Sequence, residues 1–362
     1  MNISEFVLNS EASLLDAVER LHESVIDIIL VMDKDTLLGV ITDGDIRKSI
    51  LLGASNEESI LKHMNHSPVT LDNINLRNAF SLSYETNLGS IPVVINNKVT
   101  ALFVRHLKNF ITNEHFSATQ EKIEKSTVAL IMAGGEGKRL RPYTDNVPKS
   151  LARIGDTTLI ERNLEQLAQA GLKRVFISVN YLSEMITSKL GDGSQYGLEI
   201  QYLEEVEKLG TAGPINFLKN KEFNNLIVLN ADIVCNFLYS KLDSFHSNQN
   251  NDLTVVCSKN YLPITYGVVS ANTNLEITKI EEKPIKEFWC AAGIYMFQKD
   301  ALLESLPKEL TYIDMPDLIK KFLKKNNNIK AFPLMPKHEK WFDVADLDDL
   351  EEINNQDWAH TI

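Results

Sequence analysis

The 362-residue sequence has few of the features on which several large protein classes depend. Its three cysteines, Cys235, Cys257 and Cys290, show no C-x-x-C spacing, which excludes a zinc knuckle and a disulfide framework. Its eight histidines form no close pair suited to a metal site. Positive charge is also scarce, because 37 Lys and Arg stand against 49 Asp and Glu and leave a net charge of −12. Such a chain repels phosphate backbones and anionic lipid, so we expect neither a nucleic acid nor a membrane as partner.

Long apolar runs are absent as well. No apolar run approaches the length needed to cross a bilayer, and the first fifteen residues carry no basic segment followed by an apolar one. We therefore expect a cytoplasmic location. The apolar content of 44% is enough for two or three packed domains.

Residues 1–113 contain two imperfect copies of one unit, at about 1–60 and 61–113. Each copy begins with a stretch of helical periodicity, continues with an apolar strand, a turn and a second strand, and is expected to end in a helix. The repeat resembles a tandem pair of cystathionine-β-synthase-type (CBS) modules, an α+β unit. In that family such pairs bind adenosyl ligands or mediate association, which implies a homo-oligomer.

The resemblance is best at GVITDGDI, residues 39–46. Ligand-binding copies of the family carry a hydroxyl residue followed three positions later by an aspartate, which implies an adenosyl site at Thr42 and Asp45. A hydroxyl can bond a phosphate, and a carboxylate can accept both ribose hydroxyls. The alternative is that the pair caps the following helix. The second copy has neither group at residues 102–106, so we expect one site at most.

Residues 114–126 lose the apolar pattern and are predicted to be a linker, and from 127 to 362 strands alternate with helices. Apolar strands are predicted at the start of this region and near 174–181, with an intervening helix near 158–171 that ends at a glycine. This alternation predicts an α/β domain with a Rossmann-like, mainly parallel sheet flanked by helices. Ligands of such sheets bind at the carboxyl ends of the strands.

A glycine-rich loop follows the first of these strands, at residues 134–137, and cations follow the loop. Glycines allow the backbone to approach a phosphate and to direct N–H groups at it. No Gly-Lys-Ser/Thr occurs at Walker spacing, and Lys138 and Leu140 occupy the places where a dinucleotide fingerprint has its later glycine. The loop therefore indicates a phosphate ligand but neither a P-loop kinase nor a dehydrogenase.

The full string over residues 134–149, G-G-x-G-x-R-L-x-P-x-T followed by P-K, closely resembles the signature of sugar-1-phosphate nucleotidyltransferases. Further blocks agree in order: LGTAG at 209–213, NAD at 230–232, EEKP at 281–284 and WFDV at 341–344. The resemblance covers roughly residues 127–355. It implies a GT-A-like fold and transfer of a nucleoside monophosphate from an NTP to a sugar 1-phosphate, with release of pyrophosphate.

The resemblance also implies roles for individual residues. The catalytic cations would be Arg139, Lys149 and Lys283. The nucleotide-binding residues would be Ala133, Gly134, Gly135, Gly137, Glu205, Gly210 and Thr211. The sugar-binding residues would be Gly267, Glu282 and Gly293. Mg²⁺ would be held by Asp232 and Asp343, in keeping with its preference for one or two carboxylates plus phosphate oxygens.

The nucleobase is predicted from Glu205, five residues before the Gly-Thr pair. A carboxylate only accepts hydrogen bonds, and guanine presents two adjacent donors, which favours GTP over UTP, CTP or dTTP. Joined CBS–nucleotidyltransferase chains also resemble bacterial guanylyltransferases of surface-glycan biosynthesis that act on hexosamine or heptose 1-phosphates. The alternative from a different class is a non-catalytic nucleotide sensor in which the CBS pair governs a partner.

Overall fold

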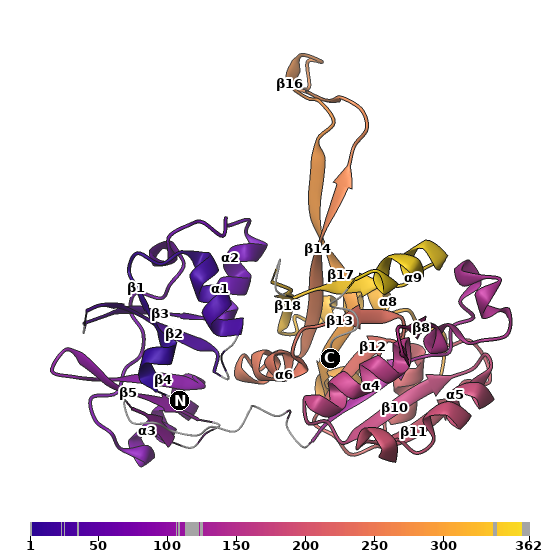
Figure 1. The fold of residues 1–362 in the computed structure, drawn as a ribbon, viewed down its shortest axis with the longest axis horizontal. Coiled ribbons are helices and arrows are strands. Elements are labelled where there is room, and N and C mark those ends of the chain that lie inside the picture. The colour runs from indigo at the N-terminus through magenta and orange to yellow at the C-terminus, as the bar shows by residue number, and fades with distance from the viewer. Residues whose placement is uncertain are drawn as a thin grey trace.

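The structure, a computed structural model, describes residues 2–22, 24, 26–34, 36–105, 107, 109–112, 123, 126–335 and 339–356. Most of the predicted linker lies outside the described residues. In the described part, a small N-terminal module lies beside a larger C-terminal α/β domain (Figure 1). No helix of the described part is both long and apolar enough to cross a bilayer.

A seven-stranded sheet in the order β11-β10-β7-β12-β17-β14-β18 forms the centre of the C-terminal domain. β7 runs parallel to β10 and β12, whereas β17 is antiparallel to both of its neighbours, β12 and β14. The predicted mixed, mainly parallel α/β sheet is therefore confirmed. The strands are β7 (Thr127–Met132), β10 (Arg174–Val179), β11 (Glu199–Glu204), β12 (Asn225–Asn230), β14 (Leu253–Pro263), β17 (Ile285–Gln298) and β18 (Ile329–Pro333).

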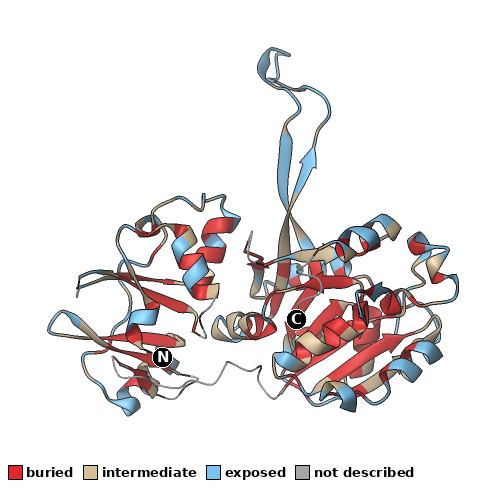
Figure 2. Ribbon diagram, in the orientation of Figure 1, coloured by how far each residue is buried: buried red, intermediate tan, exposed pale blue. Residues whose placement is uncertain are grey.

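Helices cover both faces of this sheet, and the buried residues form two layers (Figure 2). Alternate residues of β7 enter opposite layers: Ala129 and Ile131 pack with α4, α5 and α6, and Val128 and Leu130 with α7 and α8. This is the period-two burial of a strand covered on both sides. The helices are α4 (Leu159–Gln169), α5 (Ser183–Leu190), α6 (Tyr239–Asn248), α7 (Lys299–Ser305), α8 (Met315–Lys324) and α9 (Leu347–Asn354).

Local sequence accounts for the start of α4. Thr158 and Glu161 form a capping box, in which each side chain accepts a hydrogen bond from the other residue's backbone N–H. Two small two-stranded sheets complete the domain, namely β8 (Arg153–Ile154) with β9 (Thr157–Thr158), and β13 (Ile233–Cys235) with β19 (Trp341–Asp343).

The N-terminal module consists of two three-stranded sheets, one for each copy of the repeat. The first copy contains β1 (Val7–Asn9), α1 (Leu14–His22), β2 (Ile28–Asp33), β3 (Thr36–Thr42) and α2 (Asp43–Leu51). The second contains α3 (Leu76–Thr86), β4 (Ser90–Ile95), β5 (Lys98–Val104) and β6 (Asn109–Ile111). One apolar cluster contains Leu30 and Val40 from the first copy and Leu102 and Ile111 from the second, so the copies pack together.

The second copy departs from the prediction at its end. The sequence predicts a helix after β5, but the structure has strand β6 there, antiparallel to β5. Phe110 packs at a ring-centroid distance of 5.5 Å from Phe103, and Ile111 is buried in the cluster shared by the two copies. Tertiary packing of these two apolar side chains therefore outweighs the weak helical pattern.

A two-stranded ribbon projects from the central sheet (Figure 1). β18 pairs with β14 only as far as Cys257, and beyond that point β14 and β17 pair only with each other among the described residues. The ribbon ends in a hairpin of β15 (Val268–Ala271) and β16 (Ile277–Glu281). We call residues 258–290 the arm.

Candidate active site

Two aspartates meet at the carboxyl end of the central strand β12. Asp232 lies two residues beyond β12, and Asp343 is the last residue of β19. β13 pairs with β19 in a register that places Ile233 opposite Asp343, and the Val344 amide donates to the Asp232 carbonyl at 3.1 Å. The tertiary pairing of β13 with β19 thus brings the two predicted metal-binding residues together.

Lys149 and Arg139 provide positive charge at this pair. The Lys149 Nζ lies 2.5 Å from Asp232 Oδ2, and both groups are largely buried. Burial, followed by the charge of Asp232, raises the pKa of Asp343, and the charges of Lys149 and Arg139 oppose this rise. Arg139 is exposed, so its guanidinium is accessible to a ligand.

The donor set suits a hard divalent cation. Asp232 Oδ1 is buried and has no hydrogen-bond partner among the described residues. An unpaired buried carboxylate oxygen beside a second carboxylate is costly unless a cation or donor binds there. The described residues contain no cluster of three or more His, Cys, Asp or Glu with metal-binding geometry. The two aspartates are therefore compatible with Mg²⁺, which commonly takes its other ligands from water and substrate phosphates.

The glycine loop lies between β7 and a short 3-10 segment, Lys138–Leu140. Gly137 has φ +62°, and a Cβ there would meet the Lys149 Cβ at 2.8 Å. A Cβ on Gly134 would meet Glu205 Oε1 at 2.7 Å, whereas Gly135 faces open space. The loop thus packs closely against Lys149 on one side and Glu205 on the other, and keeps one glycine open for a ligand to approach.

Glu205 reaches this loop, but its carboxylate is already engaged. The Ser178 hydroxyl donates to Oε1, and the Leu209 amide donates to Oε2 at 3.2 Å. Burial raises the pKa of Glu205, and these two hydrogen bonds oppose the rise. Glu205 therefore stabilises the loop. Its predicted contact with the nucleobase stays a prediction.

The Gly210–Thr211 segment is held by a residue that the sequence analysis missed. Asp314, just before α8, accepts from the Thr211 backbone N–H at 3.1 Å, and the Thr211 hydroxyl accepts from the Met315 backbone N–H at 2.8 Å. Gly210 has φ +76°, and a Cβ there would meet the Ile313 carbonyl oxygen at 2.6 Å. No local motif identifies Asp314, because its role depends on a long-range contact.

Asn180, at the carboxyl end of β10, was also not predicted from the sequence. Its position could have indicated it, because ligands of such sheets bind at the carboxyl ends of the strands. Its side-chain amide donates to the Glu205 carbonyl at 2.5 Å. Asn230, at the end of β12, lies against Gly293, since a Cβ on Gly293 would meet Asn230 Nδ2 at 2.8 Å. Gly293 is thus near Asp232.

The two other predicted sugar-binding residues and the predicted catalytic cation Lys283 are not brought to this site. Gly267, Glu282 and Lys283 lie in the arm, which projects away from the sheet and its helices (Figure 1). A Cβ on Gly267 would meet only the Glu282 side chain within 4 Å. Within one chain the structure therefore separates these three residues from Asp232 and Asp343.

In the N-terminal module, Thr42 and Asp45 form the capping box of α2. The Thr42 hydroxyl donates to Asp45 Oδ2 at 2.7 Å, and the Asp45 amide donates to Thr42 Oγ1 at 3.2 Å. The capping alternative is therefore realised. Both residues also line a cavity of about 520 Å³, so capping does not exclude contact with a ligand.

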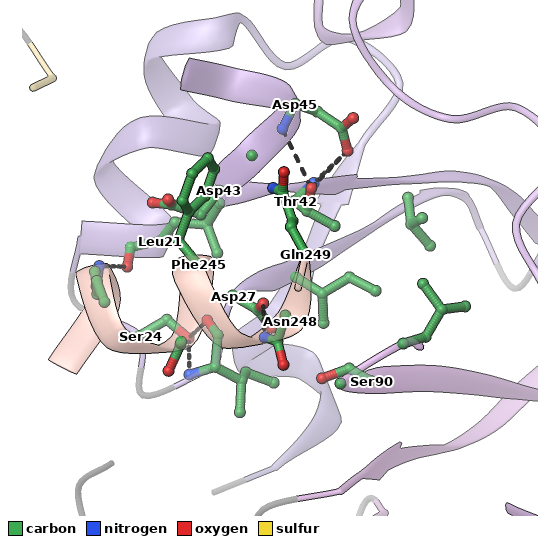
Figure 3. A pocket seen from close by; sticks show the side chains of 18 of the residues that line it. Leu21, Ser24, Asp27, Thr42, Asp43, Asp45, Ser90, Phe245, Asn248 and Gln249 are labelled. Carbon is green, nitrogen blue, oxygen red and sulfur yellow. Dashed lines mark hydrogen bonds between the residues drawn. The ribbon is translucent and has the colours of Figure 1, made fainter. Parts of the chain in front are cut away.

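This cavity lies between the two repeat copies and helix α6 of the larger domain (Figure 3). Helix α6 supplies Phe245 and Asn248, followed by Gln249. The Asn87 side-chain amide donates to the Asn248 carbonyl, and the Lys241 ammonium donates to the Leu21 carbonyl at 2.6 Å. The wall formed by α6 was not predicted, because its residues carry no motif.

The α/β fold and the two aspartates beside a glycine loop are compatible with the class of nucleotide-binding transferase domains. The chain belongs to the nucleotidyl transferase family, because the model of that family matches residues 128–360. The CBS domain model matches residues 1–52. The predicted family and the N-terminal CBS pair are confirmed.

Individual relatives agree with this assignment. The chain is 36% identical over 187 residues to the mannose-1-phosphate guanylyltransferase catalytic subunit beta of Drosophila melanogaster, covering 50% of each chain. It is 33% identical over 233 residues to a mannose-1-phosphate guanyltransferase of Saccharomyces cerevisiae, covering 61% of this chain and 62% of the relative. The chain thus spans half to under two thirds of the length of these relatives.

A solved structure assigned as a glucose-1-phosphate thymidylyltransferase, from Bacillus anthracis, has a TM-score of 0.52 and 22% sequence identity to the chain. The match covers 65% of this chain and 96% of that one. At this identity the likeness shows a shared fold.

Proposed function

We propose that the chain transfers a guanylyl group from GTP to a sugar 1-phosphate and releases pyrophosphate. The observation that carries this proposal is the pair Asp232 and Asp343, with an unpaired buried oxygen on Asp232, beside the glycine loop and Lys149. The guanylyltransferase relatives support the choice of GTP. A hexosamine or heptose 1-phosphate, surface-glycan biosynthesis and a cytoplasmic location remain our predictions.

In this reaction a phosphate oxygen of the sugar phosphate attacks the α-phosphorus, and the bond to the β-phosphate oxygen breaks. Catalysis consists mainly of positioning and charge neutralisation. Mg²⁺ held by Asp232 and Asp343 would supply positive charge at the reacting phosphates.

Residues of the chain would bind the triphosphate and neutralise the remaining charge. The open loop at Gly135 admits the triphosphate and presents backbone N–H groups. Lys149 neutralises negative charge at the reacting phosphates. The exposed Arg139 binds the departing pyrophosphate, because a guanidinium makes paired hydrogen bonds to phosphate oxygens.

The test is a pyrophosphate-release screen of GTP, UTP, CTP, dTTP and ATP against a panel of sugar 1-phosphates. We expect release with GTP and at least one sugar 1-phosphate. Asp232→Asn should then lower turnover at least ~10²-fold, the scale for loss of a major charge-stabilising contact. Asp317→Asn, at an exposed position on α8, is the matched control and should leave turnover unchanged. Failure of every pair would instead favour the nucleotide sensor.

The cavity favours a second function, binding of an adenosyl-type ligand by the CBS pair. Asp27, Asp43 and Asp45 line it, together with the side-chain amides of Asn248 and Gln249. The Asp27 carboxylate accepts hydrogen bonds, so it suits a ligand that donates them, such as ribose hydroxyls or an exocyclic amine.

Isothermal titration with adenosine, AMP and ATP tests this second function. Gln249→Ala and Asp45→Ala should each weaken binding, although the second variant also loses a helix cap. If the wild type released no heat on titration, or if both variants released the same heat as the wild type, the result would count against an adenosyl ligand in this cavity.

A further inference from the structure

Glu136, within the glycine loop, is the shared partner of two lysines. Its Oε2 lies 3.3 Å from the Lys138 Nζ, and its Oε1 pairs with the Lys208 ammonium. The two lysines come from different segments. Lys138 begins the 3-10 segment after the loop, whereas Lys208 lies two residues before Gly210. Glu136 therefore joins the glycine loop to the segment that contains Gly210.

These ion pairs are exposed, whereas a second connection between the same segments is not. The Glu136 side chain is 24% exposed, and those of Lys138 and Lys208 are 68% and 61% exposed. The half-buried Glu205 packs against Gly134 and accepts from the Leu209 amide. Exposed ion pairs contribute little to stability. The Glu205 contacts can thus hold the two segments together while the Glu136 ion pairs are exchanged for others.

A triphosphate would compete directly for the lysines that Glu136 holds. Hydrogen bonds from Lys208 and Lys138 lower the pKa of Glu136, so its carboxylate is ionised at neutral pH. The neighbouring Gly135 faces open space, where the proposed function places the triphosphate. A triphosphate brings several negative charges, which repel the single charge of the carboxylate and attract each lysine more strongly than the carboxylate does.

Both lysines can reach a ligand at the loop. Glu136 directly follows Gly135, so an ammonium that reaches the Glu136 carboxylate lies beside this open part of the loop. The four-carbon stem of a lysine is flexible and lets its ammonium move between acceptors. The net charge of −12 opposes the approach of two anionic substrates, so further local cations favour their binding.

We propose that Lys138 and Lys208 are phosphate-binding residues, and that both move from Glu136 to the β- and γ-phosphates when a nucleoside triphosphate binds. Glu136 is then a competitor that neutralises the two lysines until the triphosphate arrives. This inference rests on the proposed function, to which it adds two cations beside Arg139 and Lys149.

Isothermal titration of the full chain with GTP and with GMP, each in the presence of Mg²⁺, tests this exchange. Lys138→Met and Lys208→Met should each weaken GTP binding about tenfold, the scale of one hydrogen bond to a charged group. Both variants should bind GMP as the wild type does, because GMP lacks the β- and γ-phosphates. Glu136→Gln should strengthen GTP binding about threefold, because it removes the competing carboxylate.

Lys320→Met is the matched control. Lys320 forms an equally exposed ion pair with Asp317 on α8, at 2.9 Å, and its replacement removes the same charge from the chain. We expect this variant to bind GTP as the wild type does. All four variants should keep the wild-type melting temperature, since each loses only exposed ion pairs.

Three results would overturn the exchange. Weaker GTP binding by Glu136→Gln would show that the carboxylate supports the nucleotide site instead of competing with it. An equal loss for GTP and GMP in the lysine variants would show that these lysines do not act on the β- and γ-phosphates. An equal loss in Lys320→Met would assign the effect to net charge. If the expected pattern appears but no sugar 1-phosphate gives pyrophosphate release, the exchange stands and the proposed function alone fails.

Discussion

Arg47 joins the CBS pair to the transferase domain, and its removal should be the most destabilising single change at that boundary. Its side chain is 1% exposed and makes paired hydrogen bonds to Asp43 and to Glu339. It also donates to the Pro333 carbonyl and lies 3.6 Å from the ring centroid of Phe332. One guanidinium thus satisfies two buried carboxylates, one from each domain.

Arg47→Met keeps much of the side-chain length but leaves both carboxylates without their cation. Removing one partner of a buried ion pair costs about 3–5 kcal/mol, because an uncompensated charge remains buried. We expect a loss of this size in the free energy of unfolding, measured by urea denaturation at pH 7. The control is Arg105→Met, a half-buried arginine at the same boundary that donates to Asn248 Oδ1 at 3.0 Å. Loss of that hydrogen bond should cost about 1 kcal/mol.

The pH dependence provides a second check. Burial alone would raise the pKa of Glu339, but the charge of Arg47 and its hydrogen bonds outweigh burial and lower it below its ordinary value of 4.5. A carboxylate with a lowered pKa stabilises the fold above its ordinary pKa, and this contribution is lost as the pH falls through the folded-state pKa. The stability gap between wild type and Arg47→Met should therefore be full at pH 7 and narrow below about pH 4.5. A loss under about 1 kcal/mol at pH 7, or a gap that does not change with pH, would refute this account of the boundary.

Two further predictions concern the nucleotide loop. Gly137→Ala should lower both the melting temperature and turnover, because its Cβ would meet Lys149 at 2.8 Å, whereas Gly135→Ala, which faces open space, should leave the melting temperature of the ligand-free chain unchanged. Equal melting temperatures for the two variants would show that the loop relaxes around the added methyl group. Glu205→Gln should reduce the preference for GTP over UTP in the pyrophosphate assay, while Ser178→Ala, which removes a hydrogen bond to the same carboxylate, should preserve it. If both variants kept the preference for GTP over UTP, Glu205 would only stabilise the loop and would not contact the base.

Much of the fold is predictable from the sequence because its signals are local. The apolar run before the glycine loop marks β7, and the capping box at Thr158 marks the start of α4. Position 137 requires glycine because its φ is positive and its backbone approaches Lys149 closely. The loop can therefore be recognised in the sequence by its glycines. The end of the second repeat copy was predicted wrongly, because strand β6 is stabilised by packing against β5 rather than by its own pattern.

The sequence by itself thus determined the alternation of strands and helices, the phosphate loop and the candidate aspartates, since each depends on neighbouring residues or on strand and helix periodicity. Only the tertiary structure decided which of these groups meet. The β13–β19 register sets Asp343 beside Asp232, and the fold brings Glu339 to Arg47 and α6 to the CBS cavity. The same structure places Lys283 between β16 and β17, in the arm that projects away from the sheet (Figure 1). Such pairings join residues far apart in the chain, and no local pattern specifies them.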